Sequence, residues 1–119
     1  MRQNNIKEWL DNFKTCWIKK DIDGLMCLFS DNVEYYETPF QKLVGKEKVS
    51  EVWQEIKDQE NIDLKLDLYC TDNNKHIVKW MLDFESNGRH FDYRGIYLIE
   101  LDSQNMCSFF YQCSCTENK

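Results

Sequence analysis

The sequence predicts an α+β fold in which helices come first and an antiparallel β-sheet follows. Apolar residues recur at helical spacing in the first half of the chain, whereas further along they alternate with polar residues. Turn-forming pairs such as Asn87-Gly88 separate the alternating segments, as in an antiparallel meander. The 119 residues contain no internal repeat and no Pro/Gly-rich linker, so residues 1–119 are predicted to form a single domain.

Three helices are expected in the first half of the chain. The first runs from Asn5, its predicted N-cap, to Lys19, and its apolar stripe consists of Ile6, Trp9, Leu10, Phe13 and Trp17. A second, short helix is predicted to begin after Asp21 as its cap and to carry apolar residues as far as Phe29. Gly45 precedes the third helix, which is expected from Lys46 to Gln59.

The strands are predicted from alternation and from turn signals. Ser30, Asp31 and Asn32 favour a turn, and the strand that follows, Val33–Thr38, is expected to end at Pro39. Four more strands are predicted beyond the third helix, joined by turns at 72–74, 87–88 and 102–105: Ile62–Tyr69, Val78–Phe84, Phe91–Leu101 and Met106–Cys115.

Composition and charge exclude several classes of protein. The 15 Lys and Arg residues are scattered among 21 Asp and Glu residues, giving a net charge of −6, which argues against a nucleic acid partner. No signal peptide and no membrane-spanning segment is apparent, so a cytoplasmic location with six free cysteine thiols is expected. No metal or nucleotide cofactor is expected, because Cys113 and Cys115 lack a second ligand pair and no Gly-rich phosphate loop is present.

Several stretches of the chain together resemble a known superfamily. They are Asp21-Ile22-Asp23-Gly24-Leu25, Leu28 to Val33, Glu37-Thr38-Pro39-Phe40, Gly45-Lys46-Glu47 with Trp53, and the ending Gly95 to Asp102 with Cys107. The pattern resembles the nuclear transport factor 2-like (NTF2-like) superfamily, and within it the SnoaL-like proteins, which have a ketosteroid isomerase-like fold. The resemblance covers nearly the whole chain.

The resemblance implies a cone-shaped architecture. Three N-terminal helices would pack on a strongly curved antiparallel sheet and enclose an apolar pocket, and many such proteins dimerise through the outer sheet face. It implies little about activity, because this fold hosts isomerases, cyclases, dehydratases, hydrolases and non-catalytic binders.

Strand and helix parity then predicts which side chains face the interior of the cone. For the last strand the parity is ambiguous, because Phe109 and Phe110 are adjacent, and the hairpin register favours Phe110 inside. Apolar walls with a few polar groups are typical of a site for a small hydrophobic molecule. The predicted pocket residues are Phe13, Trp17, Tyr35, Trp53, Trp80, Tyr93, Phe110 and Gln112.

Glu37 and Tyr97 are the candidate catalytic residues. A carboxylate on the inner face of a strand would be partly desolvated and would gain base strength, and Glu37 also resembles the catalytic base of ketosteroid isomerase-like proteins. Alternatively, it lies ionised and inert at the rim. Tyr97 resembles the strand position that donates a hydrogen bond to the oxyanion in those isomerases, or else it is an ordinary core tyrosine. Phe13 occupies the position of their main tyrosine donor, so ketosteroid isomerase activity itself is not expected.

Two functional hypotheses remain open. One is a cofactor-free isomerase or cyclase in which Glu37 is the base and Tyr97 or the Trp53 N–H donates a hydrogen bond. The other is a non-catalytic module for ligand binding or dimerisation.

The outer sheet face is predicted to be partly apolar and partly charged. Ile77, Met81, Ile96 and Leu98 would face outward, which favours a homodimer through this face. Asp92 and Arg94 are expected to form a solvated ion pair there, and His76 and His90 are expected at the surface near strand ends.

Overall fold

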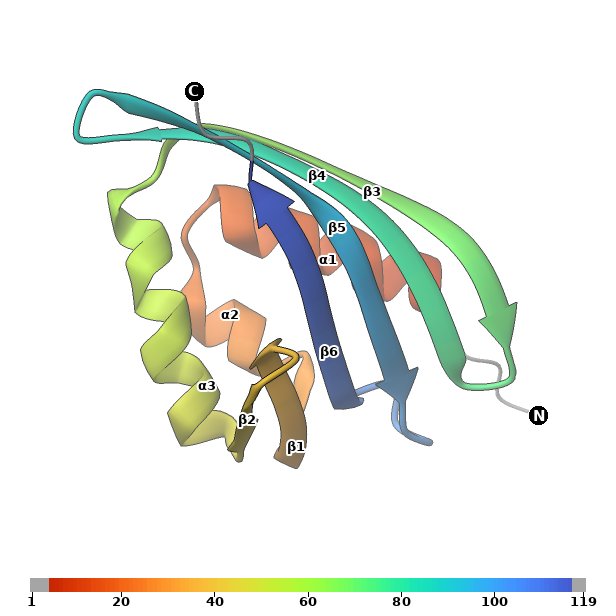
Figure 1. Cartoon of the computed structure of the whole chain (residues 1–119). Coiled ribbons are helices and arrows are strands. Elements are labelled where there is room, and N and C mark those ends of the chain that lie inside the picture. Colours follow the sequence, from red (N-terminus) through yellow and green to blue (C-terminus); the bar gives the residue numbers. More distant parts are fainter. Residues whose placement is uncertain (1–4, 117–119) are drawn as a thin grey trace.

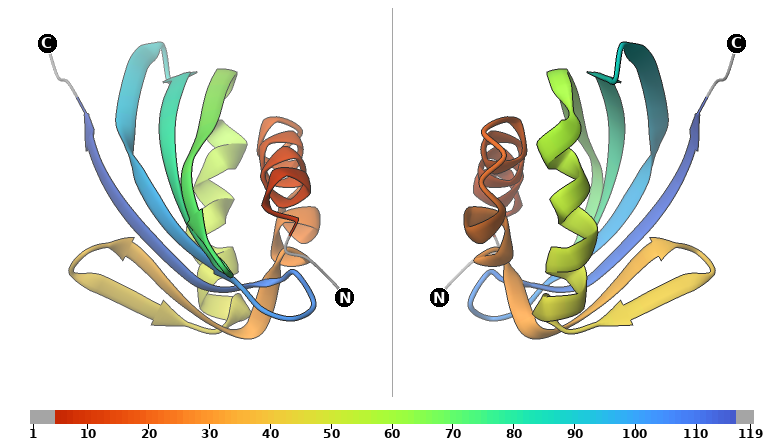
Figure 2. Two further views of the ribbon diagram at one scale, coloured as in Figure 1. Left: turned by 90° about the vertical axis from the view of Figure 1, so that its right-hand side faces the viewer. Right: turned by 90° about the vertical axis from the view of Figure 1, so that its left-hand side faces the viewer.

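The computed structural model describes residues 5–116, in which three helices lie against the concave side of one curved β-sheet (Figure 1). The side views show the sheet bending around the helices, with one short hairpin extending from its lower edge (Figure 2). Helices followed by a curved, mainly antiparallel sheet are the predicted α+β class, which the structure confirms.

The helices begin where the caps were predicted. Helix α1 (Ile6–Ile18) is capped by Asn5, whose side chain accepts a hydrogen bond from the Glu8 N–H at 3.1 Å. Helix α2 (Ile22–Met26) is capped in the same way by Asp21. Helix α3 (Lys46–Trp53) tightens into a 3-10 helix, η1 (Gln54–Asp58), so the predicted third helix changes geometry near its end. None of the described helices is long and apolar enough to cross a membrane.

Six strands form the sheet in the order β2-β1-β6-β5-β4-β3. All neighbouring pairs are antiparallel except β1 and β6, which run parallel, so the expectation of a wholly antiparallel sheet is wrong at this one junction. The strands are β1 (Phe29–Thr38), β2 (Gln41–Val44), β3 (Glu60–Asp72), β4 (Lys75–Ser86), β5 (Arg89–Leu101) and β6 (Cys107–Thr116).

The structure corrects the prediction most around β1. Helix α2 ends at Met26, and Phe29 is instead the buried first residue of β1, paired with Cys107 of β6. Residues 30–32 form no turn but lie within β1. The pairing of β1 with β6 is irregular here, because Phe29 pairs with Cys107 and the next paired residue, Glu34, pairs with Phe109, so β1 advances five residues while β6 advances two. The chain turns only at residues 39–40 and returns as β2, a strand that was not predicted.

The long hairpin of β4 and β5 follows its turn chemistry. Asn87 and Gly88 have φ angles of 53° and 76°, and two consecutive positive φ values define the predicted type I′ turn. From this turn the register continues without a break to the pair formed by Lys75 and Glu100. The regular register holds the inward residues of β4 and β5 side by side under the helices.

Aromatic side chains fill the space between the helices and the sheet. Phe13 of α1 is fully buried, stacks on Trp9 at 5.1 Å and meets Trp53 and Tyr97 edge to face at 5.5 and 5.9 Å. Buried aromatic rings supply large apolar area, and such pairs add to it through their edge and face geometry. The core therefore connects helices and sheet directly beneath the site described next.

Candidate functional site

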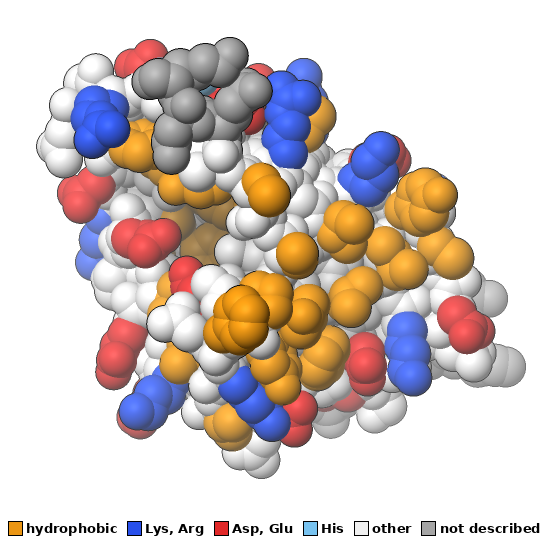
Figure 3. Space-filling view, viewed as in Figure 1, with side chains coloured by type: hydrophobic (Ala, Val, Ile, Leu, Met, Phe, Trp, Pro, Cys, Tyr) orange, Lys and Arg blue, Asp and Glu red, His pale blue; other side chains and the backbone are white. Residues whose placement is uncertain are grey.

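A cavity opens between the C-terminal half of α1, α3 with η1, the end of β1, the half of the β4–β5 hairpin nearest its turn and the C-terminal half of β6. Its volume is about 160 Å³. Figure 3 shows it as a hollow between α3 and β6, with hydrophobic side chains on its floor and acidic side chains beside it. Its walls consist of Trp17, Tyr35, Glu37, Val52, Trp53, Glu55, Ile56, Gln59, Trp80, Leu82, Phe84, Tyr93, Gln112 and Ser114.

The structure divides the predicted site residues into two groups. The cavity wall contains Glu37 together with Trp17, Tyr35, Trp53, Trp80, Tyr93 and Gln112. Phe13, Tyr97 and Phe110 are fully buried in the core and form no part of this wall.

The fully buried aromatic residues support the aromatic wall from behind. Trp80 stacks on Tyr97 with ring centroids 4.9 Å apart and 10° between planes, and Tyr35 stacks on Phe110 at 4.9 Å and 4°. Trp17 and Trp53 meet edge to face at 4.7 Å. Rings held by other rings keep their orientation, so the wall is formed before any ligand arrives.

Glu37 lies near the end of β1, where it is half-buried. The Gln112 side chain of β6 donates a hydrogen bond to the Glu37 carbonyl oxygen at 3.1 Å and so ties this end of β1 to β6. Within residues 5–116, the carboxylate atom Oε1 is buried and has no hydrogen-bond partner. Burial, and then the nearby charge of Glu55, raise the pKa of Glu37 above its usual range. The carboxylate is therefore a stronger base than it would be in water.

Glu55 is a second carboxylate of the cavity that the sequence pattern did not reveal. It belongs to η1 and lies at the exposed edge of the wall, where partial burial raises its pKa. The predicted apolar side of this segment, with Val52, Trp53 and Ile56, does line the cavity, but that pattern selects apolar residues and gives no reason to single out Glu55. The cavity wall thus holds two carboxylates, and it contains no Lys, Arg or His.

Three of the hydrogen-bond donors in the wall are tryptophan N–H groups. The Trp17 N–H donates to the Gln59 side chain at 2.8 Å, so this donor is already used. The Trp80 N–H is buried without a partner in the described chain. The Trp53 N–H lies near enough to the Tyr35 hydroxyl to lower its pKa somewhat, but makes no regular hydrogen bond.

Two tyrosine hydroxyls lie close to the carboxylates. Burial raises the pKa of Tyr35 far above its usual value, with further increases from Tyr97, Glu37 and Glu55. Burial and then Glu37 raise the pKa of Tyr97 in the same direction. Both phenols therefore remain protonated at neutral pH and can act only as hydrogen-bonding groups.

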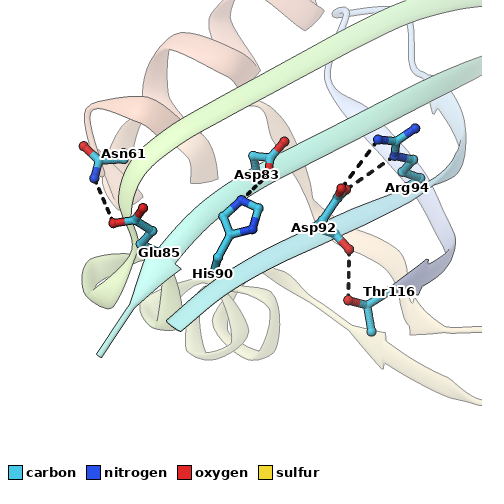
Figure 4. A network of polar contacts seen from close by, with 7 residues as sticks. All are labelled: Asn61, Asp83, Glu85, His90, Asp92, Arg94 and Thr116. Atoms are coloured by element: carbon cyan, nitrogen blue, oxygen red, sulfur yellow. Dashed lines mark hydrogen bonds and ion pairs between the residues drawn. The ribbon is translucent and has the colours of Figure 1, made fainter. Parts of the chain in front are cut away.

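The charged pairs of the β4–β5 hairpin alternate along the strands with the wall residues Leu82, Phe84 and Tyr93, and they lie outside this cavity (Figure 4). Asp92 and Arg94 are joined at 3.4 Å, with the Arg94 side chain 64% exposed, which is the solvated pair that was predicted. His90 pairs with Asp83 and is also exposed, as expected.

His76 corrects the expectation that both histidines are at the surface. It is buried and contacts the Thr71 hydroxyl through Nδ1 at 2.9 Å, and burial lowers its pKa. It points to the same side of β4 as Val78 and Trp80, so strand parity rather than its nearness to a turn decides its burial.

The fold and cavity together define a class of protein. An incomplete cone of sheet wrapped around three helices, with a cavity at its open end, is the NTF2-like or ketosteroid isomerase-like architecture. The model of the SnoaL-like domain family matches residues 7–107, and the chain belongs to this family. A sequence comparison with curated proteins gives no match.

Solved structures with the same fold include proteins with different ligands. RV0760c from Mycobacterium tuberculosis aligns with a TM-score of 0.84 and 13% identity over 98% of this chain and 99% of its own. That protein has also been solved with estradiol-17β-hemisuccinate, where the TM-score is 0.76.

Two further structures show the range of proteins on this fold. SalBIII, an epoxide hydrolase/cyclase-like enzyme of pyran ring formation in salinomycin, aligns with a TM-score of 0.80 and 11% identity over 92% of this chain and 89% of its own. A ketosteroid isomerase-like protein from Catenulispora acidiphila was solved with trimethylamine. It aligns with a TM-score of 0.73 and 14% identity over 88% of this chain and 83% of its own. At these identities the likeness shows the fold.

Proposed function

We propose that the protein binds a small, largely apolar organic molecule in this cavity and moves a proton on it without a cofactor. The observation that carries the proposal is the Glu37 carboxylate, which has a buried, unpaired oxygen in an aromatic wall and a raised pKa. Groups with these properties in a cavity are typical of general bases.

The size of the cavity limits the ligand. An engineered protein cavity of about 150 Å³ holds benzene, whereas drug-sized ligands occupy about 300–1,000 Å³. At about 160 Å³ the present cavity suits a molecule with one ring or a compact branched group.

The chemistry follows from the groups in the wall. Glu37 takes a proton from a carbon that lies between a carbonyl group and a C=C double bond. The C–H electron pair forms a new C=C bond, and the π electrons of the carbonyl group move to its oxygen. The N–H of Trp80 or Trp53, both in the wall, donates a hydrogen bond to that oxygen as its negative charge develops. As the carbonyl group re-forms, Glu37 returns the proton to the far carbon of the original C=C bond, so the double bond shifts next to the carbonyl group and the isomerisation is complete. We assign the donor to tryptophan rather than Tyr97, because Tyr97 lies behind the wall.

The relatives support ligand binding in this fold. RV0760c was solved with a steroid ester and the Catenulispora protein with trimethylamine, and SalBIII is described as a cyclase-like enzyme. The second candidate function is binding without catalysis, in which Glu37 only orients the ligand. It is favoured by the half-buried position of Glu37, which permits hydration when no ligand is present.

Proton transfer can be tested without knowing the natural substrate. The protein is incubated in D₂O with a small cyclic ketone, and exchange of the protons next to the carbonyl is followed by NMR. We expect Glu37→Gln to lower the rate of exchange by about 10²–10⁴-fold, which is the usual contribution of a general base. Ligand binding, followed by tryptophan fluorescence, should persist.

Glu34→Gln is the matched control, because Glu34 lies on the same strand, is exposed and pairs with Lys42. Its exchange rate should equal that of the wild type. If the ketone binds but the wild type and Glu34→Gln exchange its protons no faster than buffer alone does, the non-catalytic function is correct.

We also propose that the protein is a cytoplasmic homodimer. The described cysteines are all free, which suits a reducing compartment. A stripe of hydrophobic side chains crosses the convex sheet face (Figure 3), where Ile96 and Leu98 are 44% and 37% exposed. Apolar stripes of this kind on an open sheet commonly meet a partner.

A further inference from the structure

We propose that the ligand of this cavity carries a compact organic cation, an ammonium nitrogen substituted with carbon, together with an oxygen that accepts a hydrogen bond. This inference rests on the proposed function, since it names the chemical class of the small molecule that the cavity binds. It goes beyond that function because size and apolar walls alone would suit a neutral ligand equally well.

The first argument is the balance of charge. Glu37 and Glu55 both line the cavity, neither forms an ion pair in the described part of the chain, and no basic side chain lines the wall with them. A neutral ligand would displace water from the Glu37 carboxylate and leave it uncompensated beside the charge of Glu55 at the cavity edge, which costs free energy. A bound cation offsets both charges and keeps Glu37 in the ionised form that a base requires.

The second argument is the aromatic wall. Three tryptophans, two tyrosines and one phenylalanine surround the cavity, and the faces of such rings attract cations. One face of Trp80 is covered by Tyr97, so its opposite face is the one available to the cavity. Rings cannot replace the water shell of a small inorganic ion, but they suit an alkylated ammonium group, which is weakly hydrated. Recognition of quaternary ammonium groups by aromatic cages follows the same chemistry.

The third argument is an unused donor. Trp80 is only 4% exposed, and its indole N–H has no partner among residues 5–116. A buried donor without a partner costs free energy until an acceptor reaches it. An oxygen on the ligand would satisfy this donor while the ammonium group lies against the rings and carboxylates.

Choline is a suitable probe because it has a trimethylammonium group and a hydroxyl oxygen in a molecule of the right size. Its neutral counterpart is the dimethylbutanol in which carbon replaces the nitrogen, so the pair differs in charge and hardly in shape. Three of the four tryptophans line the cavity, so their fluorescence reports binding, and calorimetry measures the affinity. Both probes are titrated into the wild type, Glu55→Gln and the control Glu51→Gln, an exposed α3 residue outside the wall.

We expect choline to bind at least about tenfold more tightly than dimethylbutanol, which one desolvated cation–π contact can provide. Glu55→Gln should weaken choline about tenfold, because it removes one of two nearby charges, and leave dimethylbutanol unchanged. Glu51→Gln should change neither affinity. If dimethylbutanol binds as tightly as choline, the proposal that the ligand carries a cation is wrong, while the proposed binding of a small apolar molecule stands. If neither probe binds, both proposals fail.

Discussion

The sequence predicted the direction in which the Phe13 side chain points, but not whether it reaches the cavity. Its place in the stripe of α1 predicted correctly that it faces the sheet, but the structure surrounds it with Trp9, Trp17, Trp53 and Tyr97. Periodicity gives the direction of a side chain. Whether that side chain reaches a cavity depends on the neighbours that pack against it from other elements, which no local pattern contains.

Glu37 makes a prediction about stability and pH. Its pKa in the folded protein is above the ordinary value of 4.5, so the folded state binds this proton more tightly than the unfolded state does. The associated stability is present below the ordinary value and is lost as the pH rises through the folded-state pKa. At neutral pH the ionised carboxylate therefore lowers the free energy of unfolding.

Glu37→Gln is accordingly expected to raise the free energy of unfolding at neutral pH, with the gain disappearing below pH 4.5. Urea unfolding on either side of this value measures the difference, and the exposed Glu34→Gln serves as the control. A gain that is equal at both pH values would show that the effect comes from packing rather than ionisation.

At the scale of elements, the meander was predictable and the edge of the sheet was not. Most of residues 60–101 alternate, and the turns carry Asn, Asp and Gly, so the existence of β3 to β6 follows from local signals, although the parity of β6 does not. Strand β2 has four residues and pairs only with β1, while β1 pairs with β6 from the far end of the chain. Short strands and long-range parallel pairings are determined by tertiary contacts, which explains why residues 30–32 were misread as a turn.

Gly95 is a residue of β5 that leaves no room for a side chain against the neighbouring strand β6. It is paired with Trp80 on β4 and Ser114 on β6, both of which line the cavity. A Cβ at this position would overlap the carbonyl oxygen of Cys113, a backbone atom that cannot move aside alone.

Gly95→Ala is therefore expected to lower the free energy of unfolding by about 1–3 kcal/mol, as overpacking usually does. It should also weaken ligand binding, since the added methyl group pushes β6 away from β5. Thermal unfolding and fluorescence titration measure the two effects. Ser114→Ala adds no atom at this contact and should leave stability within about 0.5 kcal/mol. An equal loss in both variants would contradict the steric explanation.

At the scale of the whole molecule, the apolar stripe on the convex sheet face leads us to expect a homodimer. If it joins two copies, small-angle scattering should give the mass of a dimer, and Ile96→Lys with Leu98→Lys should give a monomer of unchanged fold. Stable interfaces bury about 800 Å² per partner, and a central pair of charges disfavours such burial. Ile18→Lys is the control, because Ile18 is 42% exposed at the end of α1, on the concave side of the sheet. A wild type of monomeric mass would exclude the dimer.

The parallel junction of β1 and β6 has a consequence for the order in which the protein takes shape during synthesis. Glu37 is translated early, yet the side chain that ties its strand in place, Gln112, is 75 residues further along. Until β6 has left the ribosome, β1 can pair only with β2, and one wall of the cavity does not exist. Contacts so distant along the chain form late, after their loop-closure entropy has been overcome. A nascent chain that stops short of β6 thus holds the acid and most of the rings, but no enclosed place for a ligand.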